Sequence, residues 1–192
     1  MRTDVQHLVV TGVGDDSLDW TDGWRGKAQF VILQQYADAS DNGIEADNNG
    51  EANDATPRSA PTLSNFTIIG SPNSSSSDVG MLIREGTAAS LHNMLVTGMN
   101  DSCVDVDHDE TFAQITSGAL TIANSMLNCE TTYDLESDDP ENVETWFTTG
   151  TGNVVADPAL IDPYNESVPG YAPTSSSPVL GAGMAPTDSF FD

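Results

Sequence analysis

The sequence predicts an all-β fold, a solenoid in which short parallel strands stack coil upon coil. Two observations predict it. A unit of strand, turn, strand and turn occurs twice between Leu63 and Asp109, and a polar residue recurs before the first strand of each unit. A unit repeated in this way is typical of a stacked array. A β-sandwich with similar hairpins is the alternative, because a strand roughly every 8–12 residues fits both folds.

The recurring polar residue is found five times, at spacings that suit coils with turns of different length: His7, Gln29, Asn65, Asn93 and Asn124. Each precedes an apolar or β-branched run, which is typical of a strand. We expect the three asparagines to stack at a turn and to hydrogen-bond from coil to coil.

A short second strand follows in each of four coils. Its alternation predicts two inward columns, which are Leu18, Ile44, Met81 and Val104, and then Trp20, Ala46, Ile83 and Val106. Stacked about 4.8 Å apart, such residues form one continuous core. The outward residues are Asp19, Glu45, Leu82 and Asp105, followed by Thr21, Asp47, Arg84 and Asp107.

Composition limits the class of protein. With 192 residues the chain is one domain by length, and 38% hydrophobic residues can form a core. The net charge of −25 disfavours nucleic acid and anionic membranes as partners, because both require a cationic surface. The chain contains a single lysine, Lys27. This scarcity favours a protein from a saline, marine or halophilic, environment, and an acidic secreted protein is the alternative.

The chain has no stretch of about 20 apolar residues and no apolar signal region after Met1. We therefore expect no membrane insertion, and an extracellular or cell-surface protein of which this chain is a fragment. The two cysteines, Cys103 and Cys129, fall near the same corner of adjacent coils. A disulfide and a pair of separate buried thiols both fit this placement.

We expect a single β-helix domain over residues 1–192. Repeating coils cover residues 5–128, and an irregular segment covers residues 129–192, with Trp146 and Phe147 folding over the end of the core. Residues 47–59 are polar and predict a surface loop.

The last part of the chain carries an ordered set of short motifs: Asn153, Asp157-Pro-Ala-Leu160, Tyr171-Ala-Pro-Thr-Ser175 and Ser177-Pro-Val-Leu-Gly-Ala-Gly183. This order resembles the closing segment of right-handed parallel β-helix proteins of the pectate-lyase-like superfamily. Within it, the chain looks most like uncharacterised secreted or surface proteins of marine bacteria. The resemblance implies a right-handed parallel β-helix of about five coils and says little about activity.

The strongest candidate site is the acidic outward face, whose carboxylates are expected to share a hard cation such as Ca²⁺: Asp19, Glu45, Asp47, Asp105 and Asp107. The loop acids nearby are Asp15, Asp16, Asp22 and Asp41. A solvated acidic face without a metal is the alternative. An EF-hand is excluded, because the Asp105-x-Asp-x-Asp109 run has no glycine at its sixth position.

Arg84 falls between Asp47 and Asp107 in the outward column, so it is either part of an ion-pair ladder or a catalytic base. The resemblance implies the second role, since β-helix polysaccharide lyases use a calcium-binding acid cluster with an arginine or lysine base. Five Lys plus Arg are few for a protein that binds an anionic polysaccharide. A hydrolase of the polygalacturonase type would need Gly-His-Gly and Arg-x-Lys segments, and the sequence has neither. The catalytic candidates are Asp19, Glu45, Asp105, Asp107 and Arg84.

Trp24 and Tyr36 are the candidates for stacking on sugar rings, whereas Trp20 falls in a core column. We therefore expect an acidic extracellular scaffold that binds a polysaccharide or a cell-surface glycan, with possible help from Ca²⁺. The alternatives are a polysaccharide lyase or glycoside hydrolase of the same superfamily, and an adhesin or stalk segment without a small ligand.

Overall fold

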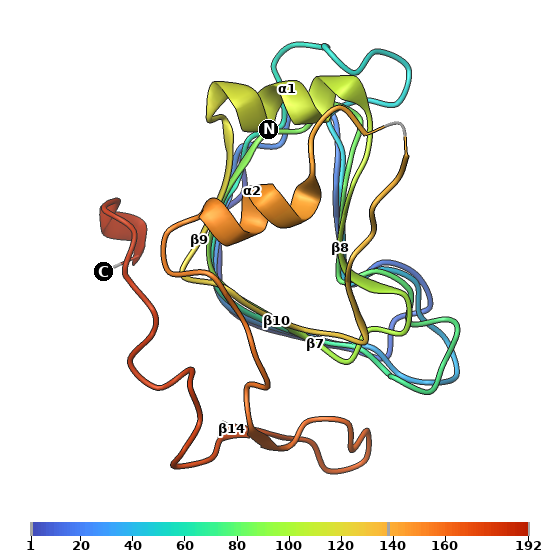
Figure 1. The fold of residues 1–192 in the computed structure, drawn as a ribbon, viewed down its shortest axis with the longest axis vertical. Coiled ribbons are helices and arrows are strands. Elements are labelled where there is room, and N and C mark those ends of the chain that lie inside the picture. Colours follow the sequence, from blue (N-terminus) through green and yellow to red (C-terminus); the bar gives the residue numbers. More distant parts are fainter. Residues whose placement is uncertain (1, 138, 192) are drawn as a thin grey trace.

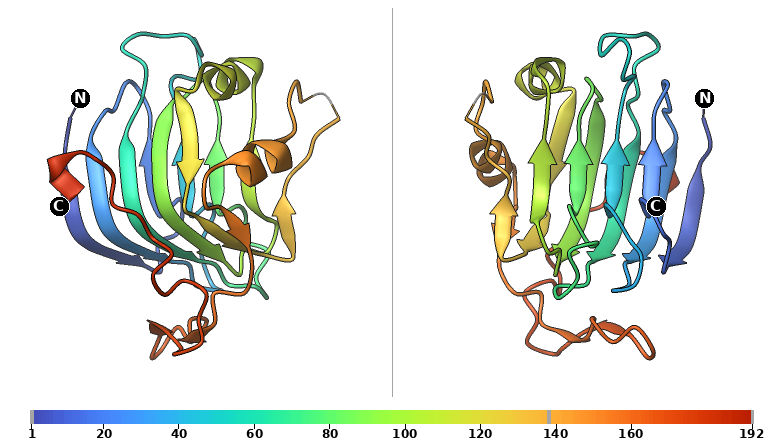
Figure 2. Two further views of the ribbon diagram at one scale, coloured as in Figure 1. Left: turned by 60° about the vertical axis from the view of Figure 1, so that its left-hand side comes forward. Right: turned by 90° about the vertical axis from the view of Figure 1, so that its right-hand side faces the viewer.

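The computed structural model describes residues 2–137 and 139–191, and it is a right-handed parallel β-helix. Successive coils lie over one another in Figure 1 and side by side in Figure 2. Sheet A contains β1 (Val5–Thr11), β3 (Lys27–Gln34), β5 (Thr62–Ile69), β7 (Ala89–Thr97), β9 (Leu120–Ala123), β10 (Met126–Asn128) and β12 (Val154–Val155). Sheet B contains β2 (Leu18–Trp20), β4 (Ile44–Ala46), β6 (Met81–Ile83), β8 (Ser102–Val106) and β11 (Thr131–Tyr133).

The register of sheet B is the one that the sequence predicts. Its parallel pairing forms the two expected inward columns, Leu18, Ile44, Met81 and Val104, and Trp20, Ala46, Ile83 and Val106. All of these residues except the partly exposed Leu18 are buried. The outward column Asp19, Glu45, Leu82 and Asp105 is also in register.

The recurring position is a bend and not the start of a strand: it lies within β1, β3, β5 and β7, and between β9 and β10 in the last coil. The backbone there has a positive φ in every coil, at His7 (59°), Phe30 (58°), Asn65 (59°), Asn93 (55°) and Asn124 (51°). Asparagine suits this left-handed conformation, and the Asn93 amide donates to Asn65 Oδ1 at 3.5 Å, as expected for stacked amides.

Gln29 was wrongly expected at the bend. Phe30 occupies it instead, because Gln29 pairs with Gln6 and Ser64 one position earlier. The Phe30 ring stacks on His7 with centroids 5.1 Å apart.

Two helices interrupt the strands, although the sequence was expected to form β-structure and irregular segments only. α1 (Asp109–Ser117) buries Phe112 and ends at Gly118, whose φ of 74° is left-handed. α2 (Val143–Thr149) begins at Asn142, whose side chain accepts a hydrogen bond from Thr145 N at 2.8 Å. Neither helix, nor any other in the described ranges, is long and apolar enough to cross a membrane.

α2 covers the end of the core beyond β11 (Figure 1). Val143 and Phe147 lie one turn apart on its inner face and are both fully buried, and Trp146 packs against the core beside them. The prediction that Trp146 and Phe147 fold over this end is therefore confirmed. Cys103 and Cys129 form a disulfide with their Cα atoms 5.5 Å apart.

The C-terminal part returns along the outside of sheet A. It contains an antiparallel pair, β13 (Leu160–Asp162) and β14 (Gly170–Pro173), and a short 3₁₀ helix at Ser189–Phe191. Figure 2 shows it crossing the outer face of the blue and green strands toward the N-terminus. Lys27 forms an ion pair with Asp188, and Gln29 Nε2 donates to Phe191 O at 3.1 Å.

Replacing the buried ring of α2 tests this cover. We expect Phe147→Ala to lower the free energy of unfolding by about 3–5 kcal/mol, because it leaves a cavity at the end of the core. The exposed neighbouring substitution Thr148→Ala is the control and should change it by less than about 0.5 kcal/mol. Chemical denaturation measures both values. A loss below about 1 kcal/mol in Phe147→Ala would contradict this role of α2.

Candidate functional site

The outward face of sheet B carries acidic residues in three columns. The first lies in the turns, three residues before the first core position of each strand: Asp15, Asp41, Asp78, Asp101 and Glu130. The backbone is stacked there, since Asp78 N donates to Asp41 O at 3.0 Å and Asp101 N to Asp78 O at 3.1 Å. The other two columns follow the strands: Asp19, Glu45, Leu82, Asp105 and Asp134, and then Thr21, Asp47, Arg84, Asp107 and Glu136.

The first column extends the acidic face beyond the residues that the sequence predicted. Asp15 and Asp41 were expected near the face, whereas Asp78 and Asp101 were not considered. The constant offset from each inward residue is the signal that could have identified them.

Arg84 is the cation on this face, and its guanidinium is bound on two sides. Nη2 lies 2.7 Å from Glu45 Oε1, and Nε donates to Asp47 Oδ1 at 3.0 Å. Asp47 is only 7% exposed, so the pair is largely shielded from solvent. Arg84 therefore forms ion pairs with two acids of the preceding coil, which neutralise part of the charge of this face.

Glu45 nonetheless remains difficult to ionise. Its pKa is raised to about 7, first by burial and then by the charge of Asp16, although Arg84 acts in the opposite direction. Asp19 also has a raised pKa, first through burial and then through the charges of Asp16 and Asp47.

Asp105 and Asp107 lie in a second group, beyond Leu82 in the column. The pKa of Asp105 is raised to about 7, first by burial and then by the carboxylates of Asp107 and Asp134. The five acids expected to share one cation are therefore divided. Glu45 and Asp47 lie with Arg84, and Asp19 is near Asp16 and Asp47. The other two, Asp105 and Asp107, lie with the acids after β11.

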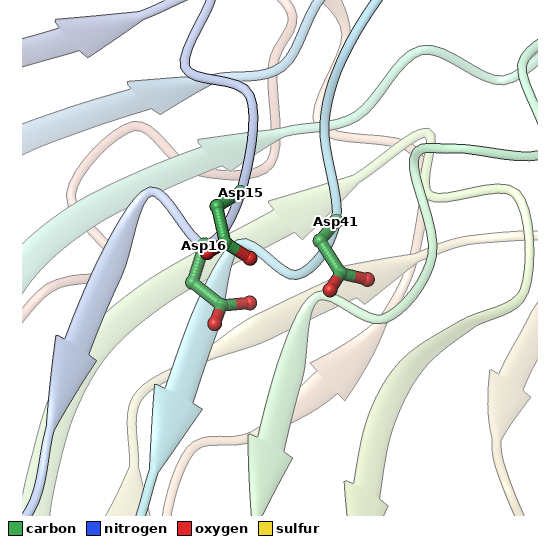
Figure 3. Close-up of side chains that lie close together, drawn as sticks. All are labelled: Asp15, Asp16 and Asp41. Atoms are coloured by element: carbon green, nitrogen blue, oxygen red, sulfur yellow. The ribbon is translucent and has the colours of Figure 1, made fainter.

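The structure brings a different set of carboxylates together. Oxygen atoms of Asp15, Asp16 and Asp41 all lie within 4.8 Å of one another, at the turns that precede β2 and β4 (Figure 3). Asp16 is held in place, because its Oδ1 accepts hydrogen bonds from Asn42 N at 3.0 Å and Asn42 Nδ2 at 2.9 Å. Three carboxylates at this spacing fit the oxygen ligands of Ca²⁺. The group of Glu45 and Asp47 does not suit a metal ion, because Arg84 already occupies it.

Comparison with family models identifies the fold family of this molecule. The model of the pectate-lyase-like beta helix domain matches residues 2–159, which is most of the 192-residue chain. The chain belongs to this family. No curated protein and no solved structure was found to match it. The family places the acidic columns on a pectate-lyase-like β-helix, and it does not by itself specify a ligand or a reaction.

The two aromatic candidates of this β-helix lie in different places. Trp24 packs against Trp20, with centroids 5.7 Å apart, and both line a cavity of about 310 Å³ together with Asp19 at the first coil. Tyr36 follows β3 and forms an isolated bridge with Ala39, in the same connection as Asp41. Trp20 itself is core, as expected, and its Nε1 donates to Thr87 Oγ1 at 3.1 Å.

The raised pKa values predict how stability depends on pH. Glu45 and Asp105 have pKa values of about 7 in the folded protein, above their ordinary values of 4.5 and 3.8. The folded state therefore binds more protons than the unfolded state in this interval, and stability falls as the pH rises from about 4 to about 7.

The substitution Asp105→Asn should reduce the loss of stability that occurs as the pH rises. We expect its melting temperature to exceed that of the unmodified protein by roughly 2–4 °C at pH 7.5 in low salt, and to be nearly equal at pH 4.5. Glu51→Gln, at an exposed acid of the long loop, is the control and should leave the pH profile unchanged. A lower melting temperature for Asp105→Asn at pH 7.5 would contradict the repulsion inferred here.

Proposed function

We propose that this protein is an extracellular β-helix scaffold that binds carbohydrate at its acidic face with the help of Ca²⁺, and that it is not a catalyst. The observation that carries the proposal is the position of Arg84. Its guanidinium is bound by Glu45 and Asp47, so it is engaged in holding adjacent coils together. An arginine in that state is poorly suited to act as a base or to bind a uronate.

Ca²⁺ is the cation that suits the remaining acids. Asp15, Asp16 and Asp41 supply carboxylate oxygens within 4.8 Å of one another, and Ca²⁺ takes six to eight oxygen ligands in flexible geometry. Burial and the charges of Asp16 and Asp78 raise the pKa of Asp41, so a bound cation would relieve their repulsion. Sugar hydroxyls are neutral oxygen ligands that can complete such a coordination shell.

Trp24 supports a carbohydrate ligand for a different reason. Its ring borders the same cavity as Asp19, which combines an apolar face with a carboxylate that can accept hydrogen bonds from hydroxyl groups. The Cys103–Cys129 disulfide supports an oxidising, extracellular compartment. A saline or marine setting remains a prediction from composition.

The second candidate function is that of a polysaccharide lyase or glycoside hydrolase. It is favoured by Glu45 and Asp105, because a carboxyl group with a pKa of about 7 can serve as a general acid at neutral pH. Asp19 and Asp107 would be the partner carboxylates. The release of reducing ends or unsaturated products from a polysaccharide panel would favour this function over the scaffold.

A calcium titration tests the proposed metal site. We expect saturating Ca²⁺ to raise the melting temperature by roughly 5–10 °C, because a ligand that binds only the folded state stabilises it. Asp41→Asn should remove most of this shift, whereas Asp38→Asn, at an exposed acid in the same connection, should retain it. An equal shift in both variants would mean that the cation binds elsewhere.

The carbohydrate part is tested by binding of the intact protein to immobilised glycans in Ca²⁺ and in EDTA. We expect binding that EDTA weakens at least tenfold, and no product release during the assay. Neither binding nor turnover across the panel would leave a structural adhesin or stalk segment.

A further inference from the structure

A groove with no charged residue lies on the side of the β-helix formed by sheet A. It has a volume of about 430 Å³ and is bounded on one side by the returning C-terminal segment, which Figure 2 shows crossing this sheet. We call it the sheet A groove, and it is lined by Phe30, Val31, Ile32, Asn65, Phe66, Thr67, Asn93, Met94, Leu95, Asn124, Met126, Val179 and Gly183. Charged residues form 18% of the chain, so their absence from this lining marks it off from the acidic face.

The floor of the sheet A groove is a column that runs from coil to coil and is apolar except at Thr67. Register places Ile32 beside Thr67, Thr67 beside Leu95, and Leu95 beside Met126. The column therefore runs across the strands, along the axis of the solenoid, and suits an elongated ligand.

One side of the sheet A groove is the row of asparagines at the bend. Asn93 is used by the protein itself, since its Nδ2 donates to Met184 O and its Oδ1 accepts from Met184 N, both at 2.9 Å. These two bonds hold the C-terminal segment against the asparagine row, where Val179 and Gly183 also line the groove. Within the part of the chain that the structure describes, the Asn124 amide makes no hydrogen bond and remains able to donate and accept.

Phe30 provides an aromatic surface in this row, between His7 and Asn65. It is 45% exposed although its backbone φ is 58°, a conformation that a bulky residue rarely adopts. The equivalent residues of the next coils are Asn65, Asn93 and Asn124, which suit the conformation better. One face of the Phe30 ring stacks on His7, with centroids 5.1 Å apart, and the ring still leaves 45% of the residue exposed at the groove.

We propose that the sheet A groove binds a neutral glycan chain. Sugar rings offer C–H faces that pack on Phe30 and on the apolar floor, and hydroxyl groups that pair with the asparagine amides. The uncharged lining disfavours uronates and other ionic ligands. This inference rests on the carbohydrate role proposed above, but it assigns a separate site that needs no calcium.

The test uses calorimetric titration of the full chain with neutral hexasaccharides of glucose, mannose and xylose, in EDTA. Phe30→Asn removes the ring and introduces the residue that the next coils carry at this position, so the fold is expected to persist. We expect at least one hexasaccharide to bind, with affinity reduced by about tenfold or more in Phe30→Asn, a loss equivalent to about 1.4 kcal/mol. Thr67→Trp, which fills the floor, should abolish binding.

Val9→Thr is the matched control. Val9 belongs to the same column, beside Ile32, but it does not line the groove, and the substitution introduces the residue found at position 67. It should leave the affinity unchanged. Each variant is checked by circular dichroism and melting temperature before titration.

Three results would overturn the proposal that the sheet A groove binds a neutral glycan. They are no binding of any neutral hexasaccharide in EDTA, equal affinity in Phe30→Asn and the unmodified protein, and binding of extended peptides alone. The acidic face is judged separately, because its binding should require Ca²⁺ and be lost in Asp41→Asn. Binding that persists in EDTA and in Asp41→Asn but fails in Phe30→Asn would support the groove, whereas the calcium-assisted site is judged only by the part of glycan binding that requires Ca²⁺ and that Asp41→Asn should remove.

Discussion

The structure depends on backbone hydrogen bonding between coils that lie in register. Parallel pairing holds each short strand against the equivalent strand of the next coil, so Ile44, Met81 and Val104 become neighbours although they are far apart in the chain. None of these strands could bury its side chains alone. In-register pairing places the equivalent residues of successive coils next to one another. It therefore also determines which polar residues are stacked on the outer face.

That stacking explains why carboxylates of the outward face of sheet B lie close together and why Arg84 lies among them. Two carboxylates about 4.8 Å apart repel each other by about 1 kcal/mol in water and by about 3.5 kcal/mol at the effective dielectric of a protein surface. Arg84 relieves this repulsion by forming ion pairs with Glu45 and Asp47. Leu82 interrupts the column between Glu45 and Asp105, which separates the acids into two groups. The lining of the sheet A groove, in contrast, contains no charged residue.

The sequence was sufficient to predict the repeat, the inward columns and the acidic face, because all three follow from local alternation and one repeated offset. It was insufficient where a residue contradicts local preference or pairs with a distant one. Phe30 occupies a left-handed position that polar residues usually take. The ion pair of Lys27 with Asp188, 161 residues apart, positions a segment that carries no repeat. The helix around Phe112 could have been predicted from its acidic first turn and the glycine that ends it.

Disulfide trapping tests the register most directly. Glu45 and Leu82 pair in adjacent coils with parallel, half-buried side chains on the outward face, so the double variant Glu45→Cys/Leu82→Cys should form a bridge on mild oxidation. Asp19→Cys/Leu82→Cys uses the same column but skips a coil, a separation of about 9.6 Å, and should not. Peptide mapping by mass spectrometry identifies the linked pair. Bridging of the second pair, or failure of the first in a folded protein, would contradict the stacking on which this account rests.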